Sequence, residues 1–316
     1  MPITISGGMT ITGGASIGAG GSSPSPSPSG VSDGYHSGGN PVVTNMIQKF
    51  SFSSDGNATN VGNLSQARNY ITGQSSSVSG YTSGGQQPSY SNVIDKFPFA
   101  SNGNATDVGD LTAAMGRLAG QYSADNGYTS GGFTGSQLNI INKFPFASDS
   151  NATDVADTTQ VLIDGTGQSS SVSGYTSGGR TSGFALTNRI EKFSFSSDSN
   201  ATTVGDITST KYMGAGQEST DNGYMSGGYD NVTWLSAIDK FPFASDNNAT
   251  TVGNLYCTRG QSAGQSSSSN GYTTGGASGG ACDQNIIDKF PFASDGNSTD
   301  VGDLVQNGKD AASQQG

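Results

Sequence analysis

The hexapeptide GYTSGG occupies residues 80–85, 127–132 and 174–179, and it recurs as GYHSGG at 34–39, GYMSGG at 223–228 and GYTTGG at 271–276. Successive copies start 46 to 49 residues apart. A repeat of this length is typical of a solenoid or a propeller, in which each unit buries its apolar surface against its neighbours. The repeat therefore decides the fold.

Each hexapeptide is followed by the phrase I-x-K-F-x-F and then by Asn-Ala/Ser-Thr with Val-Gly or Val-Ala, and a Gly-Gln stretch precedes the next hexapeptide. These phrases are short, their aromatic residues alternate, and Gly, Ser, Asn and Asp separate them, which indicates strands and not helices. We expect four strands per unit: A at Gly-Gln-Ser-Ser, B at the hexapeptide, C at I-x-K-F-x-F and D at Ala-Thr-x-Val-Gly.

The spacing within the units places all variation in length at one point. The distance from each C-strand lysine to the next B-strand tyrosine is always 32 residues, as from Lys49 to Tyr81, whereas the distance from tyrosine to the following lysine varies from 14 to 17. The loop between strands B and C, the B–C loop, is therefore free to differ between units.

The same spacing predicts how the two ends of the repeat meet. Gly-Gln follows each lysine after about 25 residues, as in Lys49 to Gln74, and the same count from Lys289 reaches Gln314. We therefore expect Ala311–Gly316 to be a sixth strand A that pairs with residues 34–39. Such a pairing closes six blades into a ring with no open sheet edge.

Three zones divide the chain. Residues 1–20 hold a small repeat with isoleucine at 5, 11 and 17, residues 21–30 form a Ser/Pro-rich linker, and residues 31–316 hold the long repeat. A short strand cannot bury its apolar side alone, so we expect residues 1–20 to be an extended β arm that pairs with another copy of the chain or with a docking protein.

Composition excludes several functions. Thirteen basic against 24 acidic residues give a formal charge of −11, which argues against nucleic-acid binding. No apolar run is long enough for a membrane helix, and the first residues lack the pattern of a secretion signal. His36 is the only histidine, so neither a Ser-His-Asp triad nor a histidine metal site is expected, and no cofactor is implied.

The six C-strand lysines admit two interpretations. They could form a ring of catalytic or anion-binding amines, but we expect each to lie across a neighbouring blade and to pair with an acid such as Asp95 or Asp110. The lysines are Lys49, Lys96, Lys143, Lys192, Lys240 and Lys289.

The turns between strands C and D resemble calcium loops, as at Asp295, Asn297 and Thr299. The bidentate Glu of such a loop is absent, and Asn102 replaces the leading Asp in one unit. We interpret these turns, and the six Asn-x-Thr sequons within them, as hairpin structure and expect no metal.

Function is expected where the units differ. The B–C loops carry five aromatic residues that we predict to form a binding surface, although they could instead cap the edges of the core. These candidates are Tyr90, Phe133, Phe184, Tyr229 and Trp234. We expect the two cysteines, Cys257 and Cys282, to lie on the same face of the sixth blade, and we predict that they form a disulfide.

The pattern resembles kelch-type β-propellers, whose units of about 50 residues end their second strand with a double glycine and carry an aromatic residue on the third. Arg68 and Arg259 match the arginine that kelch units often place before strand A, whereas Val-Gly replaces their usual strand-D tryptophan. The resemblance implies an all-β fold, a six-bladed kelch-like β-propeller of four-stranded antiparallel blades. It says little of function.

Phrases such as IDKFPFASDGN at 287–297, GQSSSVSGYTSGG at 73–85 and the opening ITISGG also resemble structural proteins of marine tailed phages, notably cyanophages. This resemblance implies a non-enzymatic virion protein, tail-, fibre- or capsid-associated and assembled in the bacterial cytoplasm. Residues 1–20 would join other virion proteins, and the head would bind a host glycan or protein. The alternatives are a carbohydrate-active enzyme such as a capsule depolymerase, or a free secreted adhesin or lectin.

Overall fold

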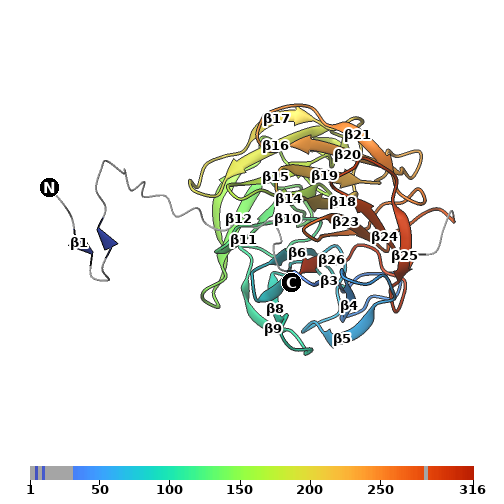
Figure 1. The fold of residues 1–316 in the computed structure, drawn as a ribbon. Coiled ribbons are helices and arrows are strands. Elements are labelled where there is room, and N and C mark those ends of the chain that lie inside the picture. The colour runs from blue at the N-terminus through green and yellow to red at the C-terminus, as the bar shows by residue number, and fades with distance from the viewer. Residues whose placement is uncertain (1–3, 6–8, 11–30, 281–283) are drawn as a thin grey trace.

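The computed structural model describes residues 4–5, 9–10, 31–280 and 284–316, and it shows six antiparallel four-stranded sheets arranged as blades around one axis (Figure 1). The chain thus forms a six-bladed β-propeller, and the predicted all-β fold with four strands per blade is confirmed. We number the blades I to VI in the order of their B strands. Strand A is innermost in each blade and strand D outermost.

The strand bounds repeat almost without change from blade to blade. The A strands are β26 (Ala312–Gln315), β6 (Thr72–Ser75), β10 (Ala119–Tyr122), β14 (Thr166–Ser169), β18 (Ala215–Glu218) and β22 (Ala263–Ser266). The B strands are β3 (Asp33–Ser37), β7 (Ser79–Ser83), β11 (Asn126–Ser130), β15 (Ser173–Ser177), β19 (Asn222–Ser226) and β23 (Asn270–Thr274). The C strands are β4 (Met46–Ser51), β8 (Val93–Pro98), β12 (Ile140–Pro145), β16 (Arg189–Ser194), β20 (Ala237–Pro242) and β24 (Ile286–Pro291). The D strands are β5 (Thr59–Asn63), β9 (Thr106–Asp110), β13 (Thr153–Asp157), β17 (Thr202–Asp206), β21 (Thr250–Asn254) and β25 (Thr299–Asp303).

The ring closes as the spacing predicts. Strand β26 pairs antiparallel with β3, with Ala312 opposite Ser37 and Gln315 opposite Gly34. Blade I therefore combines the last strand of the chain with three strands from the beginning of the repeat. Every sheet in the ring has its innermost strand beside the innermost strands of both neighbours (Figure 1).

The double glycine ends strand B for a steric reason. All six pairs have positive φ at both residues, as at Gly84 (65°) and Gly85 (109°), which is a conformation that side chains with a Cβ rarely adopt. The strand therefore ends at the residue directly before the pair, as at Ser83, whereas the sequence predicts that the strand includes the glycines. The second glycine then donates its N–H to a carbonyl of the next blade, as from Gly85 to Met115 at 2.8 Å.

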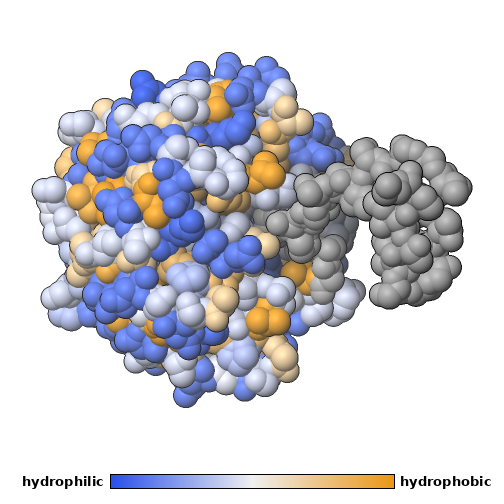
Figure 2. Space-filling view, turned by 90° about the vertical axis from the view of Figure 1, so that its left-hand side faces the viewer, coloured by the Kyte–Doolittle hydropathy of each residue, from blue (hydrophilic) through white to orange (hydrophobic). Residues whose placement is uncertain are grey.

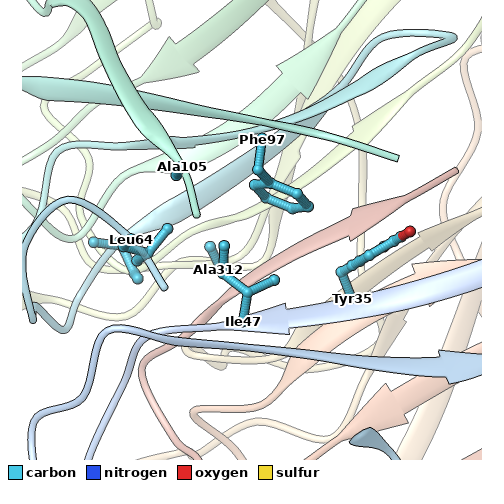
Figure 3. Close-up of a cluster of buried hydrophobic side chains, with 7 residues drawn as sticks. Tyr35, Ile47, Leu64, Phe97, Ala105 and Ala312 are labelled. Atoms are coloured by element: carbon cyan, nitrogen blue, oxygen red, sulfur yellow. The ribbon is translucent and has the colours of Figure 1, made fainter. Parts of the chain in front are cut away.

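The hydrophobic core lies between blades. Each B-strand tyrosine packs on the two C-strand phenylalanines of the next blade, as Tyr35 does on Phe97 and Phe99, with ring centroids 5.4 and 5.0 Å apart. The same contact recurs at all six interfaces. Figure 3 shows the cluster between blades I and II, to which Ile47 and Leu64 also contribute. A single blade could not bury these rings alone.

Crowding at the axis explains the Gly-Gln phrase of strand A. A Cβ added to Gly167 would lie 2.0 Å from the carbonyl oxygen of Gly120 in the preceding blade, and one added to Gly216 would lie 2.1 Å from that of Gly167. Five of the six innermost strands carry glycine at this position, and the sixth carries Ser313. The A strands can approach one another closely because five of the six lack a side chain at this position.

Near the N-terminus, β1 (Thr4–Ile5) pairs antiparallel with β2 (Met9–Thr10). The other residues of the predicted arm at 1–20, and the whole linker at 21–30, lie outside the described residues. The described part also contains one short 3-10 helix, η1 (Ser182–Phe184), in the B–C loop of blade IV. No helix among the described residues has the length and apolar character needed to span a bilayer.

The axial crowding makes Gly167→Ala a sharp test of the packing. We expect this substitution to lower the free energy of unfolding by roughly 3 kcal/mol, because the new methyl group meets backbone that cannot move aside. Gly103→Ala is the matched control, because a Cβ there meets nothing within 4 Å. Chemical denaturation of the two variants measures the difference. Equal stabilities would show that the innermost strands are not crowded.

Candidate ligand-binding face

The repeated C-strand lysines form ion pairs, mostly between neighbouring blades. Five of them form an ion pair with the aspartate of the C–D turn in the next blade, as Lys96 does with Asp149 at 2.9 Å. Lys49 lies 3.8 Å from Asp33 of its own blade, since Asn102 occupies the place of that turn aspartate. The expected contact across a neighbouring blade is thus found in five blades.

The predicted partners Asp95 and Asp110 are wrong. Asp95 is fully buried and pairs with Arg68 at 2.6 Å, and the same arrangement joins Arg259 to Asp288 and Lys211 to Asp239, both at 2.9 Å. These pairs lie within single blades. The sequence analysis singled out the two arginines but not Lys211. The residue type at this position varies between blades, so the sequence gives no sign that this lysine is buried.

The sequon asparagines and the strand-A glutamines also connect neighbouring blades. Each sequon asparagine accepts a hydrogen bond from a strand-D N–H of the preceding blade, as Asn151 Oδ1 does from Asp110 N at 3.1 Å. Each strand-A glutamine donates from Nε2 to the carbonyl oxygen of the next blade's B-strand tyrosine, as from Gln74 to Tyr128 at 3.1 Å. The repeated polar residues therefore stabilise the contacts between neighbouring blades.

The two faces of the propeller differ in what they expose. B–C loops and D–A connections emerge on one face, which we call the B–C face, and A–B and C–D turns emerge on the other. The described residues include seven exposed large hydrophobic side chains, of which five lie on the B–C face. These five are Val42, Phe184, Val232, Tyr256 and Val305. Figure 2 shows one side of the head, where hydrophobic residues form small separate areas among hydrophilic ones.

The five predicted aromatic residues all lie in B–C loops, where they form two groups. Tyr90, Phe133 and Phe184 come from blades II, III and IV, and their ring centroids are 6.0 and 6.3 Å apart in succession. Tyr229 and Trp234 of blade V are 4.5 Å apart. Phe184 is about 50% exposed, and the other four are half-buried.

Two residues that the sequence did not single out join these groups. The Arg180 guanidinium lies 5.4 Å from the ring of Phe184 and 4.3 Å from that of Tyr212, and Tyr212 in turn lies 5.9 Å from Tyr229. The result is a continuous arc of rings and one guanidinium from blade II to blade V, which we call the aromatic arc. Guanidinium groups stack favourably on aromatic faces, so the arc is also held together laterally.

At the centre of the B–C face, the six blades each place one residue around the mouth of the axis. All six of these residues have positive φ, between 52° and 63°, and we call them the mouth ring. They are Tyr70, Arg117, Asp164, Met213, Gln261 and Asp310. Five successive hydrogen bonds, from the N–H of one to the carbonyl of the preceding one, run around the ring from Tyr70 to Asp310 at 2.7 to 3.0 Å.

The mouth ring lines a cavity of about 120 Å³ on the axis. On one side of it, Asp164 forms ion pairs with Arg117, at 3.1 Å, and with Arg180, and the Arg117 guanidinium lies 4.1 Å from the ring of Tyr70. On the opposite side of the cavity, side-chain amides donate hydrogen bonds to the second carboxyl group. Asp310 accepts hydrogen bonds from Gln261 Nε2 at 2.8 Å and from Asn40 Nδ2 at 3.3 Å, and burial raises the pKa of Asp310 to about 6.

At the other end of the A strands, alternate blades supply large and small residues. Tyr122 Oη donates to Glu218 Oε1 at 2.6 Å, and Gln315 Nε2 donates to the same oxygen at 3.0 Å and to Tyr122 Oη at 2.5 Å. The serines of the intervening blades accept the N–H groups of these three residues, at 2.9 to 3.0 Å. These serines are Ser75, Ser169 and Ser266. We call this arrangement the axial network.

Two buried groups titrate unusually. Burial raises the pKa of Glu218, in the axial network, to about 7. Burial lowers the pKa of His36 to about 4, and the ring Nδ1 of this histidine is 3.0 Å from Thr274 Oγ1. His36 packs beside Gly308, where other blades hold longer side chains, and so it has a core position.

The sequence thus located the aromatic residues of the B–C face but missed its centre. The mouth ring cannot be recognised as a repeated motif in the sequence, because its six positions carry five residue types. Cys282 lies outside the described residues, so the Cys257–Cys282 disulfide stays a prediction. No family model matches the sequence, and a search of curated proteins likewise finds no match.

We expect Glu218→Gln to change how stability depends on pH. The wild-type carboxyl binds a proton more tightly when folded, so its contribution to stability is present below about pH 4.5 and is lost as the pH rises through about 7. Between pH 5 and pH 8 the wild type should lose roughly 2 to 3 kcal/mol relative to the variant. Urea denaturation at the two pH values measures this change.

The control for that measurement is His36→Thr, which has the opposite sign. Neutral His36 stabilises the fold above about pH 6.5, and this contribution is lost as the pH falls toward 4, so the wild type should lose stability relative to His36→Thr on acidification. Parallel pH profiles for the wild type and Glu218→Gln would contradict a buried carboxyl in the axial network.

Proposed function

We propose that this is a non-enzymatic virion protein whose propeller head binds a ligand on the host surface through its B–C face. Residues 1–20 join it to other virion proteins, and residues 21–30 hold the head away from the particle. The resemblance to structural proteins of marine tailed phages supports the place in the virion. The proposal for the head has its own support in the distribution of variable residues.

The single observation that carries the binding role is the contrast between repeated and variable residues. The repeated lysines, glutamines and asparagines form contacts between blades, and five of six lysines pair with the next blade. Many residues that differ between blades lie on the B–C face, in the aromatic arc and the mouth ring, and those of the axial network lie at the other end of the A strands. A rigid scaffold that carries variable aromatic side chains on its loops is the usual construction of a binding surface.

Removal of residues 1–20 tests the virion role. We expect a head with an unchanged melting temperature, because the described contacts of residues 31–316 do not involve the arm, but no incorporation into phage particles. Particle incorporation is measured by immunolabelling of purified virions, and full-length protein is the control. Normal incorporation of the truncated protein would contradict an attachment role for the arm.

One observation favours the alternative of a carbohydrate-active enzyme such as a capsule depolymerase. Asp164 and Asp310 are acids that do not recur in the other blades, and blades IV and I place them on opposite sides of the cavity. Pairs of carboxyl groups in different environments are characteristic of glycoside hydrolysis. Our proposal expects no release of reducing sugar from purified host envelope polysaccharide. Release that is abolished by Asp310→Asn would establish the enzyme instead.

A free secreted adhesin or lectin would use the same face and would differ in having no place in the particle. Immunolabelling of intact virions separates the two roles. We expect labelled particles, and protein found only in the medium would favour the adhesin.

A further inference from the structure

The mouth ring combines an unusual backbone with chemically diverse side chains. A residue with a Cβ in the left-handed region costs about 1 kcal/mol or more, and glycine avoids this cost. The chain, which contains 49 glycines, places none of them at these six positions. Residues held in such conformations occur preferentially where a ligand is bound, and here they surround a cavity to which all six blades contribute.

The charges around the cavity restrict what it can bind. Both guanidinium groups near it, those of Arg117 and Arg180, already pair with Asp164. The carboxylate of Asp310 accepts hydrogen bonds from the two neutral amides named above, which leaves it with further capacity to accept hydrogen bonds. The charge of Lys309 also acts on this carboxylate and opposes the rise of its pKa that burial causes, and the remaining capacity of the carboxylate to accept hydrogen bonds suits donors such as hydroxyl groups.

The shape of the cavity points the same way. Planar polar groups of Asp310 and Gln261 lie on one side, and the stacked Tyr70 ring and Arg117 guanidinium lie on another. A cavity of about 150 Å³ holds a ligand the size of benzene, so the 120 Å³ here admits one edge of a hexose and not the whole ring. A polyhydroxylated ring presents hydroxyl groups at its edge and apolar C–H groups on its faces. The hydroxyl groups suit the side with Asp310 and Gln261, and the C–H groups suit the side with Tyr70.

We propose that the axial cavity binds one edge of a hexose unit of a glycan, with Asp310 and Gln261 hydrogen-bonding its hydroxyl groups. This inference rests on the proposed binding function and assigns its ligand class and its central site. The aromatic arc then lies beside the cavity on the same face, where it contacts neighbouring sugar units of a longer chain.

Binding of simple sugars to the full-length protein tests the site. The probes are D-glucose, D-galactose, D-mannose and N-acetylglucosamine, each measured by ligand-observed NMR and by isothermal titration. We expect at least one to bind with a Kd near 1 mM, a typical affinity for a single small ligand of about −4 kcal/mol. Asp310→Asn and Gln261→Ala should each weaken that binding tenfold or more.

Asp295→Asn is the matched control, since it removes a carboxylate that pairs with Lys240 in a C–D turn on the other face. Its sugar affinity should equal that of the wild type. Circular dichroism of each variant verifies the fold, and retention of binding by two folded mouth-ring variants would overturn the site. Failure of all four sugars, or Asp310-dependent binding of calcium or inorganic phosphate in their place, would also overturn it.

These outcomes are separate from those of the proposed function. A head that joins particles and adheres to host cells but binds none of the sugars leaves the virion role standing and removes only the hexose site. A head that binds a sugar but joins no particle keeps the site and removes the virion role.

Discussion

The contact between neighbouring blades is the constraint on which the rest of the structure depends. A blade of four short strands depends on its neighbours for its core, because its B-strand tyrosine packs on the phenylalanines of the next blade. Each blade therefore gains stability from both neighbours, and a missing neighbour exposes an aromatic face on each side. A closed ring is the arrangement in which every blade has two neighbours.

This dependence explains why the repeat is so uniform. At each interface the same tyrosine, phenylalanine pair, glutamine, asparagine and double glycine meet, and a change at one of these positions affects two blades. The axis adds a further limit, because the innermost strands touch through backbone where glycine is present. Variation is found in the B–C loops and at the mouth of the axis, where backbone hydrogen bonds that need no particular side chain join neighbouring blades, and there a binding surface can be built without loss of the ring.

The sequence predicted the ring because the ring depends on repeated residues. The constant distance from Lys49 to Tyr81 defined the rigid part of each unit, and the same count to Gln314 predicted the closing strand that pairs with β3. The lysine partners were assigned wrongly, because the repeat shows that a lysine is needed but not which of several nearby acids it reaches in the next blade. Asn102 breaks the pattern, and only the structure shows that Lys49 is the lysine affected.

The candidate site was predicted only in part, for a related reason. Long loops of variable length drew attention to Trp234 and Phe184, whereas Asp310 and Glu218 occupy positions that hold other residue types in the remaining blades. These residues are important because the ring brings them together near its axis, and a sequence pattern does not show this proximity. The left-handed conformation of Asp310 and the buried environment of Glu218 are likewise consequences of the ring and not of local sequence.

Hydrogen exchange of a protein shortened by residues 309–316 tests the closed ring most directly. We predict that amides of β15 and β16 in blade IV, on the far side of the ring, lose protection by about the same factor as those of β3, because opening one interface removes the mutual support of all six blades. Full-length protein is the reference. Loss of protection confined to blade I and its two neighbours, with blade IV unchanged, would contradict a single cooperative ring.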